Sequence, residues 1–384
     1  MSRAQFKYGS SSSSNILQQQ TATFPDSTTP LHLHPMPPTL YHLQQIQNVL
    51  PPTLYPAIIT AVAQGFLKLH QQQVQLAPVV HLGPFDATST QLDDCCIKAG
   101  SVIDEEHFVV KIATGGFASN LSRQLPTADG LMVVFSQQTG QCEGILLDQG
   151  WLTDMRTAAA GAVAAKLLHP SRPVTRIGMI GTGIQARFQL LLLKRVQACR
   201  AVVLYGRNAA RTLRAKKDIE AMGYSVTIVS DIQSLCLQCH FIITTTSSTT
   251  PLIMNDWVQP GTHITAVGAD GIGKQELDPN ILLRASIVVC DEISQCVAFG
   301  ETSHAVKMGL LLNAEEQERR RTSDTNKIVS LGDLVLREKE GKRWARKKKH
   351  DITVFDSTGV AVQDVAIASL TLSLLKKKGT ASKL

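Results

Sequence analysis

Residues 174–193, VTRIGMIGTGIQARFQLLLL, decide the fold of this chain. Their apolar beginning and apolar end flank the glycine-rich turn GTGIQA at residues 181–186. A G-x-G-x-x-A between a strand and a helix is typical of a dinucleotide-binding turn, in which Gly181 permits the tight bend and Gly183 lets the backbone approach a pyrophosphate. The small Ala186 lets helix and strand pack closely, and the helix N-terminus faces the phosphates. The stretch therefore predicts a bound dinucleotide; a glycine-rich turn without a ligand is the alternative.

After this stretch, predicted strands alternate with predicted helices. A helix is predicted near 208–222, and the strands lie at residues 201–205, 225–229, 241–246, 263–267 and 286–290. Alternation at this period predicts an α/β fold with a mostly parallel, doubly wound sheet of the Rossmann type. We assign this dinucleotide-binding domain to residues 169–324.

The N-terminal half differs from this pattern. A helical pattern from about residue 40 is followed by short strands between residues 74 and 147, and an Ala-rich helix over 158–168 leads into the glycine-rich stretch. Thr139-Gly140 predicts a hairpin between two of the strands.

The C-terminal part is too small for a third domain, since it offers one strand at 352–355 and one apolar helix at 361–375. We therefore predict that residues 325–375 return to residues 38–168 and form a second, α+β domain. The Rossmann-type domain would then be inserted into that second domain.

Composition excludes two classes of partner. With 384 residues, 43% hydrophobic and 18% charged, the chain is typical of a globular protein with room for two domains, and no apolar run approaches a membrane span. The net charge of +7 resides largely in local basic runs at 337–349 and 376–378. Such runs are more often solvated loops than binding faces, so we expect neither a nucleic acid nor a membrane as partner.

Eight cysteines without a secretory signal indicate reduced thiols in an intracellular protein. Cys236-Leu-Gln-Cys239-His240 matches a haem-attachment pattern, but it lies directly before an apolar strand and we interpret the match as chance. A zinc site would need a second pair of ligands at suitable spacing, and none is evident in the sequence. We therefore predict no metal.

Both ends of the chain differ from the body. Residues 1–37 are rich in Ser, Gln, Pro and His, and we expect a disordered low-complexity tail. Residues 376–384 read as a basic tail that ends in Ser382-Lys383-Leu384, the S-K-L peroxisomal address. This predicts a peroxisome or related microbody as location and its import receptor as partner; a coincidental terminus in a cytoplasmic protein is the alternative.

Polar residues at predicted strand and helix ends suggest the chemistry. Asp270 follows an apolar strand, Lys111 lies within one, and Arg156 precedes the Ala-rich helix. Two cations and a carboxylate suit a small amino or imino acid, because the cations hold its carboxylate while the aspartate meets its nitrogen.

Six stretches in this order resemble the ornithine cyclodeaminase/μ-crystallin family over about residues 50–375. They are VVKIATGGFASN (109–120), GLMVVFSQQTG (130–140), LTDMRTAAAGAVAAKLL (152–168), GMIGTGIQAR (178–187), THITAVGADGIGKQELDP (262–279) and TVFDSTGVAVQDVA (353–366). The resemblance implies a nucleotide domain inserted into a substrate and dimerisation domain, usually in a homodimer.

By position, the resemblance makes Lys111 and Arg156 the ligands of the substrate carboxylate and Asp270 the acid/base that holds the reacting amine. It implies a cofactor site for NAD at Thr157, Gly181, Gly183, Ile184, Gln185, Thr245, Thr246, Ser247, Val267 and Lys274. Asp148, Glu276 and Asp364 are interpreted as structural.

The activity that the resemblance implies first is ornithine cyclodeaminase, which converts L-ornithine to L-proline and ammonia. NAD⁺ takes a hydride from the α-carbon, the side-chain amine attacks the imine, ammonia leaves, and the hydride returns. The alternatives are an NAD(P)H-dependent imine or ketimine reductase, an alanine dehydrogenase, and a non-catalytic NADP(H)-binding protein of the μ-crystallin type.

Two departures from the family weaken the ornithine assignment. Where cyclodeaminases place a further arginine, residues 77–83 offer only His81 as a cation. The second strand of the nucleotide domain ends in Tyr-Gly-Arg-Asn at 205–208, without the acid that usually holds the ribose of NAD. Arg207 would accommodate the 2′-phosphate of NADP; a solvated residue at a helix start is the alternative.

Overall fold

A computed structural model of the chain describes residues 37–83, 93–170, 172–311, 327–342, 348–379 and 382–383. The predicted disordered tail therefore lies outside the described residues, apart from residue 37. Residues 38–384 belong to one compact unit.

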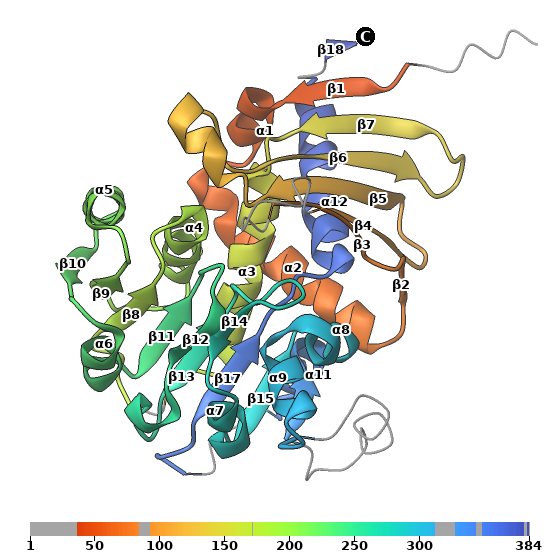
Figure 1. Ribbon diagram of the computed structural model, residues 1–384. Helices are drawn as coiled ribbons and strands as arrows, with labels where there is room; N and C mark the ends of the chain where they lie inside the picture. Colours follow the sequence, from red (N-terminus) through yellow and green to blue (C-terminus); the bar gives the residue numbers. More distant parts are fainter. Residues whose placement is uncertain are drawn as a thin grey trace, which may run out of the picture. The chain divides into compact units, whose positions relative to one another are not determined.

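One half of this unit is a parallel sheet in the order β10-β9-β8-β11-β13-β17-β15-β16 (Figure 1). Its strands are β8 (Ile177–Ile180), β9 (Ala201–Tyr205), β10 (Ser225–Ile228), β11 (Phe241–Thr244), β13 (His263–Ala266), β15 (Ile287–Cys290), β16 (Ile328–Ser330) and β17 (Thr353–Asp356). The central strands are buried along their whole length, as expected for parallel strands covered on both faces. The predicted Rossmann-type α/β class is confirmed.

Helices and two short strands connect these strands. They are α4 (Ile184–Leu193), α5 (Ala209–Ala221), α6 (Ile232–Gln238), α7 (Pro279–Arg284), α8 (Ile293–Phe299) and α9 (Glu301–Lys307), with β12 (Thr249–Ile253) paired to β14 (Gln275–Leu277) and the 3₁₀ turn η3 (Asn255–Trp257).

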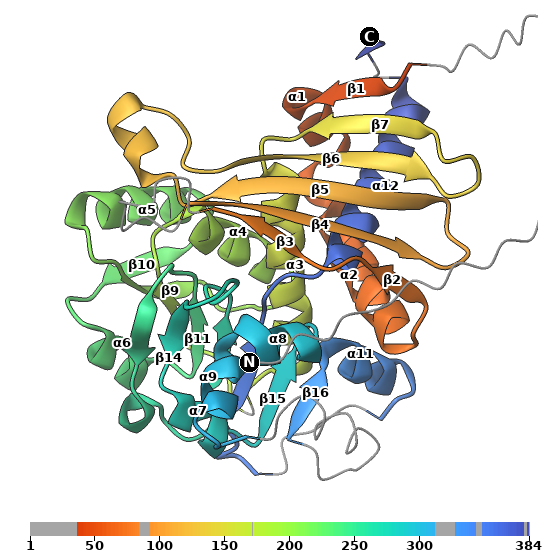
Figure 2. The same ribbon diagram turned by 45° about the vertical axis from the view of Figure 1, so that its right-hand side comes forward.

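The other half is a mostly antiparallel sheet (Figure 2). It contains β1 (Thr39–His42), β2 (Val74–Leu76), β3 (Val80–Leu82), β4 (Asp94–Val102), β5 (His107–Gly115), β6 (Asp129–Ser136) and β7 (Cys142–Leu147). Its helices are α1 (Leu43–Val49), α2 (Tyr55–His70), α3 (Trp151–Leu167), α11 (Leu331–Lys339) and α12 (Ala361–Lys378), with 3₁₀ turns η1 (Pro52–Leu54) and η2 (Ala118–Arg123). The predicted hairpin at Thr139-Gly140 joins β6 to β7.

Helix α3 joins the two halves, because it packs against α4 on one side and against α2 and α12 on the other. Its buried side chains are mostly alanines, which let helices approach closely on several faces. At Gly161 an added Cβ would collide with the side chain of Gln189 on α4. The core around α3 therefore continues from one sheet to the other.

The structure departs from the sequence prediction at two boundaries within the folded body. Strands β16 and β17 pair within the parallel sheet, whereas the predicted boundary at residue 324 placed them in the other domain; only α11 and α12 return to the antiparallel half. The helix predicted at 158–168 begins at Trp151, so Arg156 and Thr157 lie on it.

The predicted basic tail is also wrong in part. Lys376, Lys377 and Lys378 form the last turn of α12, where cations are stabilised by the helix dipole. Ser382–Lys383 form a short strand, β18, that pairs antiparallel with β1. Leu384 lies outside the described residues.

Within the described ranges, no single helix is both long and apolar enough to span a bilayer, although the bent pair Leu43–Val49 and Pro52–His70 passes that test jointly.

Candidate active site

The glycine-rich turn follows β8 and leads into α4. Gly181 has a φ of +117°, and an added Cβ would lie 2.6 Å from Thr245 Oγ1, so only glycine fits there. Around Gly183, by contrast, an added Cβ would meet no atom within 4 Å. This open space lies at the N-terminus of α4, where the backbone N–H groups of Ile184 and its neighbours are not used within the helix. The turn thus fits a pyrophosphate.

Two side chains fix this turn. Arg187 donates from Nη1 to the carbonyl oxygens of Thr182 and Gly183, at 2.9 and 2.8 Å. Gln185 donates from Nε2 to Asp154 Oδ1 on α3, at 2.7 Å. The Gln185 side chain is therefore already engaged, and a phosphate would be met by its backbone.

A buried carboxyl organises the ends of β11 and β13, where Thr245, Thr246, Ser247 and Val267 were predicted to flank the cofactor. Glu276 accepts from Thr244 Oγ1 at 2.7 Å, from Thr246 N at 2.6 Å and from Gly268 N at 2.8 Å. Burial raises the pKa of Glu276 to about 7, although these hydrogen bonds oppose the shift. The residue is structural, as interpreted from the sequence, but it shapes the wall of the site.

Asp270 lies four residues after the end of β13, in a loop rich in glycine, and its side chain is 51% exposed. Packing around the carboxyl raises its pKa, but the ammonium of Lys274, 2.6 Å from Oδ1, outweighs this and the pKa is lowered. The charge of Lys98, on β4 of the other sheet, lowers it further. Asp270 is thus paired with Lys274 of its own loop, and Lys98 is the cation of the antiparallel half whose charge acts on it.

Lys111 on β5 and Arg156 on α3 meet at Asp364 on α12. Arg156 Nε lies 2.9 Å from Asp364 Oδ1, and Lys111 Nζ lies 3.9 Å from Asp364 Oδ2. All three are buried, with exposures of 2% for Lys111, 5% for Arg156 and 1% for Asp364. Burial lowers the pKa of Lys111 to about 8, because Asp364 only partly offsets the loss of water.

Lys98 is a third buried cation that the sequence analysis missed. It is the register partner of Lys111 across β4 and β5, and it donates to the carbonyl oxygens of Thr358 and Gly359 at 3.0 and 2.6 Å. A lysine on an inward position of a strand is the signal that could have revealed it.

Three other predicted cofactor residues are placed as follows. Thr157 lies on α3, where its hydroxyl donates to Thr153 O. Arg207 is exposed two residues after the end of β9, and the residue that follows it, Asn208, caps α5. Lys274 is engaged with Asp270.

Comparisons with known proteins identify the family of this chain. Residues 54–378 match the ornithine cyclodeaminase/mu-crystallin family. The alanine dehydrogenase of Archaeoglobus fulgidus is 37% identical over 268 residues, covering 69% of this chain and 76% of that protein. The iminosuccinate reductase of Paracoccus denitrificans is 33% identical over 281 residues, covering 73% and 81%.

The fold is also that of a solved archaeal alanine dehydrogenase dimer with bound NAD. The TM-score is 0.76 at 28% identity, with 91% of this chain and 99% of that chain covered. This confirms the predicted family and its NAD cofactor. The chain belongs to the ornithine cyclodeaminase/mu-crystallin family, a group of NAD(P)-dependent oxidoreductases and cyclodeaminases.

Proposed function

We propose that this chain is an NAD(P)-dependent oxidoreductase that interconverts a small 2-imino carboxylate and the corresponding 2-amino carboxylate. The observation that carries the proposal is the set of three buried cations, Lys98, Lys111 and Arg156, of which Lys98 lies close enough to Asp270 for its charge to lower the pKa of that carboxyl. Buried cations that outnumber the buried carboxylates around them favour the binding of an anion. The carboxylate of a substrate supplies the missing negative charge.

Each residue has a distinct task in this reaction. Lys111 and Arg156 hold the substrate carboxylate, since Arg156 keeps guanidinium N–H groups beyond the Nε that faces Asp364. Asp270, ionised beside Lys274, faces the substrate nitrogen and exchanges a proton with it. Bound NAD(P)(H), seated on the Gly181–Gly183 turn, supplies or takes up two electrons as hydride.

Ornithine cyclodeamination, which the sequence analysis placed first, becomes the second candidate. Ornithine carries a second ammonium at the end of its side chain, and Lys98 adds a third buried positive charge beside Lys111. Like charges in a buried site repel, so Lys98 disfavours a diamino acid. Asp270 is the observation in favour of ornithine cyclodeamination, because its carboxylate can pair with an ammonium group of the substrate.

The cofactor preference follows from the end of β9. An exposed Arg207 stands where NAD-specific enzymes place an acid that binds the ribose hydroxyls. We propose that the chain accepts NADPH as well as NADH.

Three incubations of the pure protein test these assignments. NADH or NADPH is supplied with Δ1-pyrroline-2-carboxylate, or with pyruvate and ammonia, and oxidation of the cofactor is followed. L-Ornithine is supplied with NAD⁺, and proline, ammonia and net NADH are scored. Oxidation of the cofactor with amino acid formed supports the oxidoreductase. Proline and ammonia without net NADH support the cyclodeaminase, and cofactor binding without turnover of any substrate contradicts both in favour of a binding protein.

A further inference from the structure

The loop that connects β17 to α12 is held from the nucleotide-binding half by the Gln295 side chain on α8, which donates to Thr358 Oγ1 and Gly359 O, and by one buried carboxylate. Asp291, the residue after β15, accepts from Ser357 Oγ at 2.9 Å, from Thr358 Oγ1 at 3.1 Å and from Gly359 N at 2.6 Å. Its side chain is fully buried. Three consecutive residues of the loop are thus fixed by Asp291.

The opposite side of this loop contacts the substrate-binding cations. Gly359 adopts a φ of +77°, and an added Cβ would lie 2.6 Å from Arg156 Nη1. The Nη1 group donates to Gln363 Oε1 at 3.0 Å, and the same oxygen accepts from Val360 N at 2.8 Å. Lys98 donates to the carbonyl oxygens of the loop, as described above. The loop therefore forms a rigid wall against which the guanidinium lies.

We propose that Asp291 is a positioning residue for substrate binding: it fixes residues 357–359, and through them the place of Arg156 and Lys98. We assign Asp291 no direct contact with substrate or cofactor, since its side chain is fully buried and bonded to protein atoms. Its effect reaches the substrate only through the cations, so it should govern affinity for the carboxylate rather than the chemical step. This inference rests on the proposed function in so far as Arg156 holds a substrate carboxylate.

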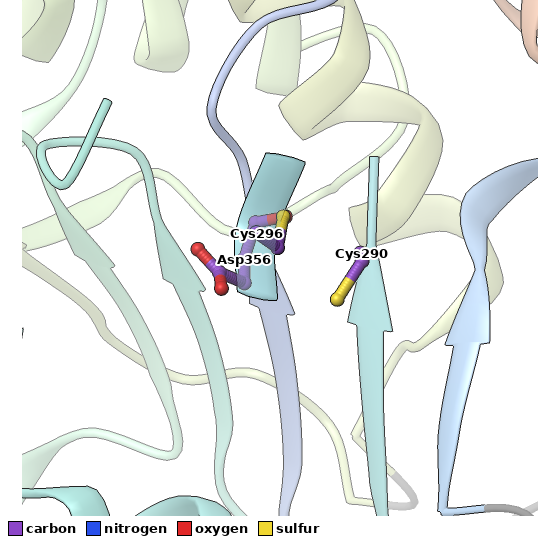
Figure 3. Close-up of side chains that lie close together, drawn as sticks. All are labelled: Cys290, Cys296 and Asp356. Carbon is purple, nitrogen blue, oxygen red and sulfur yellow. The ribbon is translucent and has the colours of Figure 1, made fainter. Parts of the chain in front are cut away.

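One of the two neighbouring thiols, Cys296, supports Asp291, and the surroundings of Cys290, Cys296 and Asp356 do not favour a metal ion. Figure 3 shows Cys290 and Asp356 on neighbouring strands with Cys296 on the helix beside them, and their ligand atoms lie within 4.8 Å of one another. However, Asp356 already accepts from Glu301 N and from the N–H and hydroxyl of Thr302, and burial raises the pKa of the Cys296 thiol well above its usual value. Cys296 instead donates to Asp291 Oδ1 at 3.3 Å.

The test compares Asp291→Asn with Asp356→Asn, a neighbouring buried carboxylate whose side chain has no hydrogen bond to residues 357–359 among those described. An asparagine turns one accepting oxygen into a donor, which leaves a loop donor without a partner and displaces the loop. For Asp291→Asn we expect KM for the carboxylate substrate to rise about tenfold or more, with kcat and the Kd for NADH changed by less than about threefold. Asp356→Asn should leave KM within about threefold.

An unchanged KM in Asp291→Asn, or an equal loss of kcat in both variants, overturns the proposal. If the wild-type protein turns over none of the substrates above, the proposed function fails on its own, and crystal structures decide the positioning role. In Asp291→Asn, Arg156 Nη1 should then have left Gln363 Oε1. An Arg156 that stays in place contradicts the inference.

Discussion

At Asp270, the ammonium of Lys274 keeps the carboxyl ionised, with Nζ 2.6 Å from Oδ1. The substitution Asp270→Asn preserves the shape of the side chain but removes its ability to exchange a proton. General acid–base catalysis contributes about 10²–10⁴-fold, so we expect turnover to fall by that factor. The affinity for NADH, measured by its fluorescence, should stay unchanged. The exposed carboxylate of Asp256 provides the control, since Asp256→Asn should leave turnover intact. Undiminished turnover in Asp270→Asn would remove this residue from the mechanism.

Lys111 gives the site a pH dependence whose sign is fixed. Burial lowers its pKa to about 8, so the ammonium is charged below that pH and neutral above it. The substrate carboxylate loses this partner as the pH rises, and KM should increase roughly fivefold between pH 8 and pH 9 while the Kd for NADH stays constant. Lys111→Arg keeps the charge at all these values, so its KM should rise less. A KM for wild type that is flat over this range would show that Lys111 does not bind the carboxylate.

The site residues that lie in recognisable motifs could be predicted from the sequence. The residues that pair with them in the folded chain could not. Lys111, Arg156 and Asp270 lie in recognisable stretches; the structure brings Lys111 and Arg156 together at Asp364, whereas Asp270 pairs with Lys274 of its own loop. Asp364 was interpreted as structural and Lys98 was missed, because their importance comes from pairings across the sheet and between distant helices. The inward position of Lys98 on its strand is a local signal of burial, but its pairing with Lys111 across the sheet and the contacts of Asp364 with α3 and β5 have no local pattern.

At the scale of elements, the two glycines in the turn from β8 into α4 have different roles: Gly181 is required by the backbone, and Gly183 leaves space for the cofactor. Gly183 has an ordinary φ of −77° and open space around its Cβ position, so Gly183→Val should fold normally but fill the space that a pyrophosphate needs. We expect the Kd for NADH to rise at least about tenfold, or ~1.4 kcal/mol, with an unchanged Tm. Gly181→Ala should lower the Tm as well, because of its positive φ and the nearby Thr245. Normal NADH affinity in Gly183→Val would mean that the cofactor does not lie on this turn.

The elements themselves followed from local periodicity, whereas their pairing did not. The strands β8, β9 and β11 are short apolar runs between helices, which is a pattern that the sequence displays directly. In the sheet, β17 lies between β13 and β15. In the chain it comes after both of them and after β16. That position depends on backbone hydrogen bonds between segments far apart in sequence, so the strand was assigned to the wrong half.

For the molecule as a whole, we propose a peroxisomal location through Ser382-Lys383-Leu384. The structure pairs Ser382–Lys383 with β1, so a receptor that reads these residues would compete with this short strand. A fluorescent protein fused to the N-terminus should colocalise with a peroxisomal marker, and deletion of Leu384 should disperse it. A fusion that is equally dispersed with and without Leu384 would leave the cytoplasm as the location.

We also propose a homodimer that forms through the open face of the antiparallel sheet. Along β5 and β6 the residues alternate: Val109 and Met132 are buried on the side of the helices, while Phe108, Val133 and Phe135 on the other side are half-buried and apolar. Phe108 and Phe135 stack there with ring centroids 4.8 Å apart. An antiparallel sheet that faced water would carry polar residues on this side, so the apolar face requires a partner, and a second copy offers a matching surface.

Light scattering should give the mass of a dimer, and Val133→Lys should shift it to the monomer with the far-UV circular dichroism retained. The matched change Thr60→Lys, on an exposed position of α2, should leave the dimer intact, whereas a wild-type monomer at micromolar concentration would refute the interface.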